Sequence, residues 1–168
     1  MKILFIVADS LRPDYLGCYH PSRQTPRIDR LAAGGMRFTN AYLTTSQCSP
    51  TRCSLITGRY PHNNRVEGFY DVKDPDYPVL ADLMREGGYF TAIRGKVSHS
   101  TPYTPYAWDA VLDTTANGKK RHIKDAASYG DSMRDAITLS AKADKPFCVL
   151  INISDPHKPF YAQGKGGE

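Results

Sequence analysis

The sequence predicts an α/β fold in which helices flank a mostly parallel sheet, and three observations support this prediction. Residues 3–7 form a continuous apolar run rich in β-branched side chains, as in a strand that is buried on both faces of a parallel sheet. Strand-like and helix-like segments then alternate along the chain. Reactive polar side chains follow the strand-like runs or begin helices, and open α/β sheets bind their ligands at the carboxyl ends of the strands.

Proline and glycine mark the boundaries of the expected elements. Pro26 suits the first turn of a helix that ends at Gly34. Pro50 suits a helix that opens just after Cys48. The segment 99–109 is rich in proline and tyrosine, and we expect it to be a loop. We expect helices over residues 26–33, 50–57, 78–88 and 128–143, and strands over residues 3–7, 36–43, 89–96 and 145–154.

Composition and charge indicate which kind of molecule the protein binds. Hydrophobic residues make up 40% and charged residues 23% of the 168-residue chain, which is ordinary for one globular domain with its own core. The formal net charge of +5 favours an anionic partner. Lysine and arginine are spread along the chain, and the one cluster, residues 118–124, is interpreted as a solvated loop rather than a nucleic-acid site. A small anionic substrate explains the excess, so we expect no nucleic-acid partner.

The N-terminus and the cysteines bear on the cellular compartment. The N-terminal apolar run is too short to span a membrane and carries no signal-peptide cleavage pattern, so we expect no membrane partner. The four cysteines show neither a C-x-x-C pair nor the spacing of a zinc site. These features predict a reduced, cytoplasmic protein, or a periplasmic or secreted one if the start of the chain is incomplete.

Residues 47–61, QCSPTRCSLITGRYP, carry the densest set of reactive side chains. A cysteine at a helix N-terminus is a candidate thiol nucleophile, whereas a lone cysteine is more often buried and inert. Here Cys48 opens a C-x-P-x-R pattern that ends at Arg52, with LITG beyond it at residues 55–58. This pattern resembles the signature of the type I sulfatases, with Thr51 in place of the commoner serine.

The resemblance extends over the whole chain. Similar segments in that family correspond to residues 3–19, 25–42, 87–99 and 147–160, and the branch that looks nearest is the iduronate-2-sulfatase and heparan N-sulfatase group. The resemblance implies an alkaline-phosphatase-like fold, of which residues 1–168 would be the N-terminal part of the catalytic domain.

The activity that the resemblance implies is hydrolysis of a sulfate ester or sulfamate in a small sulfated substrate, such as a sulfated sugar. In this family the motif cysteine, which corresponds to Cys48, is oxidised to formylglycine by a formylglycine-generating enzyme. One hydroxyl of the hydrated aldehyde attacks sulfur, and the other later expels sulfate. A thiol could not release the ester by that route.

Five more side chains match functional positions of the family. Arg52 would hold the formylglycine diol, and Lys96 and His99 would bind the sulfate oxygens and the diol. His157, with Lys158 beside it, would protonate the leaving oxygen or anchor the sulfate. Taken singly, a lysine or a loop histidine is usually solvent-facing and an arginine usually makes a surface ion pair, so these roles rest on the motif matches.

A divalent metal is also implied, calcium first, with magnesium or manganese as alternatives. Asp9 resembles the first metal carboxylate, and Ser10 and the formylglycine at Cys48 would complete the ligands in this part of the chain. Ser10 stands where many members carry a second aspartate, which removes one charge. Asp9 alone would be interpreted as a cap or turn residue. Further ligands in the family lie on a later strand, so we expect these residues alone to lack metal-dependent activity.

Two other functions stay open. A phosphonate or phosphate monoester hydrolase on the same scaffold fits the neutral Ser10, and a catalytically incomplete anion-binding fragment fits the missing ligands. The remaining histidines and cysteines are interpreted as unreactive surface or packing residues: His20, His62, His122, Cys18, Cys53 and Cys148.

Overall fold

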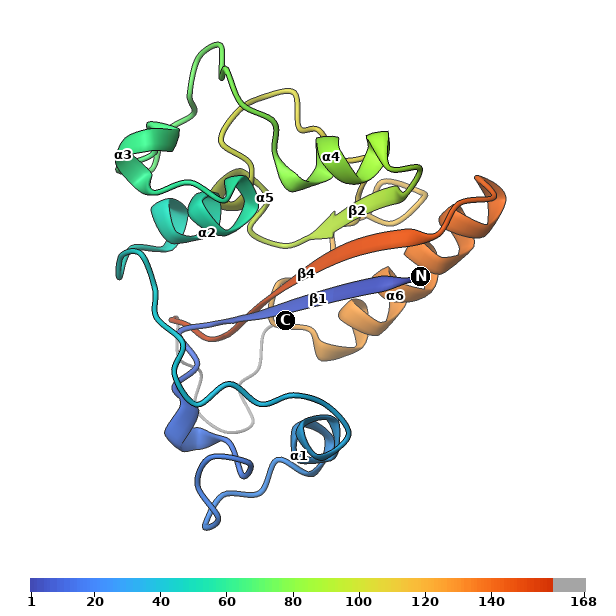
Figure 1. Ribbon diagram of the computed structural model, residues 1–168. Helices are drawn as coiled ribbons and strands as arrows, with labels where there is room; N and C mark the ends of the chain where they lie inside the picture. The colour runs from blue at the N-terminus through green and yellow to red at the C-terminus, as the bar shows by residue number, and fades with distance from the viewer. Residues whose placement is uncertain (159–168) are drawn as a thin grey trace.

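The computed structural model of the protein describes residues 1–158 (Figure 1). The elements in chain order are β1 (Ile3–Asp9), the 3-10 helix η1 (Pro13–Tyr15), α1 (Pro26–Ala33), α2 (Cys48–Thr57), α3 (Pro61–Asn64), α4 (Leu80–Glu86), β2 (Phe90–Arg94), α5 (Val97–Ser100), β3 (Ala110–Val111), α6 (Ala126–Lys142) and β4 (Phe147–Pro156). No helix in this part of the chain is both long and apolar enough to cross a membrane.

The four strands form one parallel sheet in the order β1-β4-β2-β3. β4 lies between β1 and β2 and pairs with both, so that Cys148 is opposite Ile3 on one side and Thr91 on the other. Parallel neighbours need crossover connections, and the helices between the strands supply them. The predicted α/β class with a mostly parallel sheet is therefore confirmed.

Helices pack on both faces of the sheet (Figure 1), but β1 is open on one face. Leu4 and Ile6 of β1 are 46% and 53% exposed, so the expectation that residues 3–7 are buried on both faces is wrong. On one face, Ile93 and Leu150 pack with side chains from α2, α4 and α5. On the other face, Val149 and Ile151 pack with Ala136 of α6. Successive strand residues point to opposite faces, so burial on both faces explains why the β4 sequence is apolar without alternation. At the carboxyl ends of the strands, Asp9 of β1 is opposite Pro156 of β4, and Gly95 after β2 is hydrogen-bonded to Asn152 of β4.

Some predicted elements differ from the observed ones. The strand expected over 36–43 is wrong: this segment has no regular structure, and its large side chains, such as Tyr42 at 89% exposed, do not enter the core. An apolar pattern does not make a strand without a neighbour to pair with. β2 ends at Arg94 rather than residue 96 because Gly95 and Lys96 turn the chain. α2 begins at Cys48 itself, and the short α3, α5 and β3 were not expected.

The basic segment 118–124 is a loop whose residues are mostly exposed, as its composition suggested, but two of its charged side chains are buried against the protein. The side chains of Arg121 and Lys124 are both 7% exposed. Arg121 donates to the Leu112 carbonyl at 3.1 Å and pairs with Asp135 of α6, while Lys124 pairs with Asp155 at the end of β4. These two charges therefore fasten the segment to the sheet and to α6.

The packing of the sheet leads to a stability prediction. Ile93 is fully buried between β4 and the helices on its face, whereas Ile137 of α6 is 46% exposed. Ile93→Ala should lower the free energy of unfolding by about 2–5 kcal/mol, because it deletes buried methyl groups and leaves a cavity. Ile137→Ala is the matched control, with an expected loss below about 1 kcal/mol. Urea unfolding of both variants measures the difference, and equal losses would contradict this core assignment.

Candidate functional site

Asp9 is the last residue of β1 and lies at the carboxyl edge of the sheet. The pairing with β4 shifts register between Ala8 and Asp9, and the Asp9 residue is 8% exposed. Ser10 follows in a left-handed conformation with φ of 60°, and it is exposed. The strand thus delivers one buried carboxylate to the edge and turns away at the next residue.

The first turn of α2 places Cys48 and Arg52 together on one side of the helix. Residues four apart in a helix are neighbours on its surface. Arg52 Nε donates to Cys48 Sγ at 3.2 Å, and the Arg52 guanidinium lies 3.7 Å from Asp9 Oδ2. The C-x-P-x-R spacing therefore directs both side chains at the Asp9 carboxylate, which lies 4.0 Å from Cys48 Sγ.

The turn after β2 brings the next two residues to the same place. Lys96 Nζ lies 3.0 Å from Asp9 Oδ2, and His99 of α5 has its Nδ1 3.5 Å from Cys48 Sγ. Asp9, Cys48, Arg52, Lys96 and His99 therefore form one cluster, which we call the Cys48 cluster. Three separate regions of the sequence contribute to it.

The Cys48 cluster carries an excess of positive charge. One carboxylate, Asp9, faces both Lys96 and Arg52, so a net cationic charge remains next to Cys48 Sγ. Burial lowers the pKa of His99 below its ordinary value, and the Lys96 and Arg52 charges lower it further, against the opposing effect of Asp9. His99 is therefore neutral at pH 7, and the cluster is suited to binding an anion at Cys48.

The described residues do not fit a hard divalent cation by themselves. Such a cation takes six to eight oxygen ligands, and the cluster offers a single carboxylate that two cations already face. Within residues 1–158, no group of three or more His, Cys, Asp and Glu side chains could hold a metal ion. The metal-ligand roles of Asp9, Ser10 and Cys48 remain predictions.

His157 and Lys158 follow β4 and stay outside the hydrogen bonds of the Cys48 cluster. Lys124 donates to the His157 carbonyl oxygen, which ties the end of β4 to the basic segment. His157 makes a minor contribution to the lowered pKa of His99, of which burial is the main cause. The functional roles predicted for His157 and Lys158 remain predictions.

The other histidines and cysteines lie away from this chemistry. His20 bonds to Ser22, His62 stacks on Tyr60, and the Nδ1 atom of His122 accepts from a backbone N–H. In the described part of the chain all four cysteines are free thiols, and Cys53 and Cys148 are buried.

The sequence interpretation missed Asn152 and Phe69. Asn152 of β4 is buried, accepts a hydrogen bond from Arg52 and donates to the Gly95 carbonyl at 2.7 Å. A single amide inside the apolar run CVLINIS was its only signal. Phe69 is an exposed aromatic whose ring lies edge-on to His99 at 5.2 Å between centroids.

Comparisons with known proteins agree on one family. The family model described as Sulfatase matches residues 2–165. The chain is 31% identical to an ulvan-active sulfatase from Formosa agariphila, over 95% of this chain and 31% of that protein. It is 36% identical to iduronate 2-sulfatase from Mus musculus, over 95% of this chain and 36% of that protein.

Solved structures support the same fold. A protein solved in complex with its substrate D-glucosamine-2-N,6-O-disulfate matches with a TM-score of 0.76 and 23% identity, over 94% of this chain and 35% of that one. A phosphonate monoester hydrolase of Agrobacterium radiobacter matches with a TM-score of 0.71 and 22% identity, over 98% of this chain and 43% of that one.

The chain belongs to the sulfatase family. Its sheet and flanking helices have the alkaline-phosphatase-like fold of the sulfatases, as the resemblance implied. The chain spans about a third of the length of the curated relatives described above, 31% and 36%.

Thiol labelling can test the environment of Cys53. Burial raises the pKa of this thiol to about 11, so at pH 8 only on the order of 0.1% of it is the reactive thiolate. Iodoacetamide at pH 8 should therefore leave Cys53 unmodified while it labels the less buried Cys18, and unfolding in urea should remove the difference. Mass spectrometry of the two peptides measures it, and equal labelling in the folded protein would contradict the buried position.

The lowered pKa of His99 predicts a dependence of stability on pH. A histidine whose pKa falls on folding contributes stability above its unfolded pKa of about 6.5, and this stability is lost as pH falls through the folded value. The melting temperature should therefore drop more between pH 7 and pH 5 in the wild type than in His99→Gln. His62→Gln is the control, since the exposed His62 lies outside the cluster. Parallel pH profiles for wild type and His99→Gln would show that the assigned environment of His99 is wrong.

Proposed function

We propose that this chain provides the nucleophile side of a hydrolase that cleaves sulfate esters or sulfamates. The observation that carries the proposal is the Cys48 cluster, in which Arg52 Nε, His99 Nδ1 and Asp9 Oδ2 lie 3.2, 3.5 and 4.0 Å from Cys48 Sγ. Membership of the sulfatase family supports the same activity.

The proposed nucleophile is a formylglycine formed from Cys48 by a formylglycine-generating enzyme. When present, this group supplies a hydrated aldehyde that attacks sulfur and later releases sulfate. The position fits the modification because Cys48 is the first residue of α2, is only partly buried and begins the C-x-P-x-R motif. Its side chain points into the cluster rather than into the core.

The surrounding residues bind and orient the anionic group. Lys96 and Arg52 are fixed positive charges that counter the negative charge of sulfate oxygens, and they require no reorganisation when the substrate arrives. Neutral His99 is able to accept a proton at a ring nitrogen beside the Cys48 position. His157 is proposed to protonate the leaving oxygen or anchor the sulfate, with Lys158 beside it.

A divalent metal is expected from the sulfatase family alone, and not from the contacts of the described residues. Sulfatases generally use a divalent metal, and calcium was expected here, with Asp9, Ser10 and Cys48 as ligands. In the described residues the Asp9 carboxylate is instead neutralised by Lys96 and Arg52. We therefore assign no step of the reaction to a metal.

The proposed substrate is a small sulfated sugar. Relatives of the chain include an ulvan-active sulfatase and an N-acetylgalactosamine-6-O-sulfatase. The protein with the TM-score of 0.76 was solved with a sulfated glucosamine. The exposed ring of Phe69 beside His99 offers an apolar surface for one face of a sugar ring.

Phosphonate or phosphate monoester hydrolysis is the second candidate. It is favoured by the match to the Agrobacterium radiobacter enzyme, which covers 98% of this chain, and by the uncharged Ser10 next to Asp9. A tetrahedral phosphonate would meet the same positive charges. A non-catalytic anion-binding role is the third candidate.

Substituting the two cysteines of the motif tests the proposal in the full-length protein. Cys48→Ala should abolish hydrolysis of an aryl sulfate, because it removes the residue that is converted. Cys53→Ala is the matched control and should retain most of the activity, because Cys53 Sγ donates to the backbone carbonyl of His99 and to none of the reactive side chains of the cluster. Turnover is measured with protein made together with a formylglycine-generating enzyme, and mass spectrometry reports conversion of Cys48.

The alternatives give different results in the same assay. Equal losses from both substitutions would mean that the motif has been misread. Faster turnover of a phenyl phosphonate ester than of the aryl sulfate would favour the second candidate. Binding of sulfate without turnover of either substrate would favour the third.

A further inference from the structure

The turn between β2 and α5 has an uncommon backbone conformation. Gly95 and Lys96 are consecutive residues with positive φ values, 73° and 50°. A Cβ atom at Gly95 would lie 2.6 Å from the Asn152 carbonyl oxygen, so only glycine fits there. Lys96 does carry a side chain, and a left-handed conformation of such a residue persists only where its surroundings enforce it.

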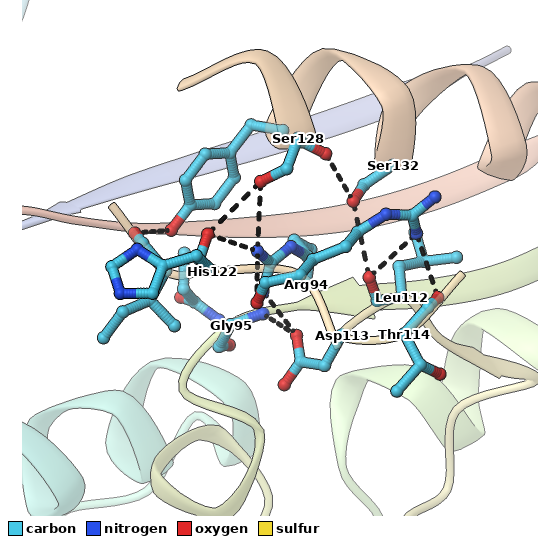
Figure 2. Close-up of polar contacts among 12 residues, drawn as sticks. Arg94, Gly95, Leu112, Asp113, Thr114, His122, Ser128 and Ser132 are labelled. Atoms are coloured by element: carbon cyan, nitrogen blue, oxygen red, sulfur yellow. Dashed lines mark hydrogen bonds and ion pairs between the residues drawn. The ribbon is translucent and has the colours of Figure 1, made fainter. Parts of the chain in front are cut away.

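One restraint on this turn comes from Asp113, which follows β3. Gly95 N donates to Asp113 Oδ1 at 2.7 Å, and the same oxygen accepts from Arg94 at 2.8 Å (Figure 2). Arg94 is the residue before the turn, and its side chain is fully buried. The Asp113 carboxylate therefore binds the chain at two successive residues.

Buried Arg94 links this restraint to the basic segment. Its guanidinium donates to the His122 carbonyl at 3.1 Å and to Ser128 Oγ at 3.4 Å (Figure 2). The Tyr129 ring covers it, with 4.8 Å from the guanidinium carbon to the ring centre. Arg94 is thus held by the segment before α6 and by α6 itself, and its position limits where Asp113 can lie.

The opposite restraint comes from Asn152 on the neighbouring strand β4. Its amide nitrogen donates to the Gly95 carbonyl at 2.7 Å and to Ser100 Oγ at 3.3 Å, while its amide oxygen accepts from Arg52. One buried side chain therefore connects both ends of the segment 95–100 to the arginine of the Cys48 cluster.

We propose that Asp113 and Asn152 are positioning residues that fix Gly95 from two sides. Asp113 accepts a hydrogen bond from the Gly95 N–H, and Asn152 donates one to the Gly95 carbonyl. Because Lys96 and His99 follow within four residues, these two restraints determine where their side chains lie. Neither Asp113 nor Asn152 needs to touch the substrate. The statement that this turn serves catalysis rests on the proposed function. The hydrogen bonds that restrain the turn do not depend on that function.

Hydrogen exchange tests the restraint independently of any activity. In the full-length protein, Asp113→Ala should speed exchange of the amides in residues 95–100, and Asn152→Ala should do the same. Asp109→Ala is the matched control. Like Asp113, Asp109 accepts a hydrogen bond from a backbone amide, Thr91 N at 2.8 Å, and pairs with an arginine, Arg85. Its contact is at the start of β2, whereas Gly95 follows the end of β2. Asp109→Ala should speed exchange near residue 91 and leave 95–100 unchanged.

Asp113→Asn separates positioning from stability. Asparagine keeps an oxygen that accepts from Gly95 N but removes the charge opposite buried Arg94. It should restore slow exchange over residues 95–100 and most of the turnover, even though the melting temperature falls. If turnover instead falls in proportion to the melting temperature in both Asp113 variants, Asp113 has only a structural role and the inference is wrong.

A double-mutant cycle connects the restraint to Lys96. Asp113→Ala alone should lower kcat/KM for an aryl sulfate by about 10- to 100-fold, as misplaced catalytic groups do. In a Lys96→Ala background Asp113→Ala should cause a smaller fold-loss than in the wild type, because one of the two groups that it positions is already gone and only its effect on His99 remains. Asp109→Ala should act equally in both backgrounds. Full additivity of Asp113→Ala and Lys96→Ala would overturn the inference.

Failure of the two proposals can be told apart. A wild-type protein with Cys48 converted but with no turnover would refute the proposed function, and the exchange experiment would still decide the inference. Unchanged exchange over residues 95–100 in Asp113→Ala would refute the inference, even in an active enzyme.

Discussion

The Asp9 carboxylate is the interaction on which the arrangement of the site depends. It pairs with Lys96 after β2 and with Arg52 of α2, so three segments that are distant in sequence meet at one oxygen atom. Without this carboxylate, two largely buried cations would face each other uncompensated, which is unfavourable in a poorly solvated place. Asp9 neutralises only one of these two positive charges. The remaining positive charge favours binding of an anion at the Cys48 cluster.

Much of the fold follows from local sequence patterns. The strands at 3–7 and 145–154 were predictable from their continuous apolar runs, although only β4 is buried on both faces. α6 was predictable from its apolar side. The segment 36–43 was mispredicted because composition records how apolar a segment is, and not whether a neighbouring strand is there to pair with it. Two-residue β3 has no pattern of its own, since its place is set by pairing with β2.

The candidate site was predictable where its contacts are local or its motif is specific. Cys48 and Arg52 are one helical turn apart, so the motif itself places them together. The hydrogen bonds of Asn152 and Asp113 to Gly95 span 57 and 18 residues of sequence. Asn152 falls in the segment 147–160 that resembles the family, but neither residue matched a functional position there. Their importance becomes visible only when the chain is folded. In the basic segment 118–124, the burial of Arg121 and Lys124 was missed for the same reason, because their partners Asp135 and Asp155 are remote in sequence.

The strand order has a consequence for how the protein is assembled during synthesis. β1 and β2 do not pair with each other within residues 1–158; each pairs with β4, which is made after both of them. A ribosome that has released β1, α2 and β2 has therefore released Asp9, Cys48 and Lys96 without the strand that brings them to one edge. Local helices can form during that interval, but long-range pairing has to wait. Within residues 1–158 the strands join into one sheet only when β4 is inserted between β1 and β2, and the charged groups around Cys48 meet at that point.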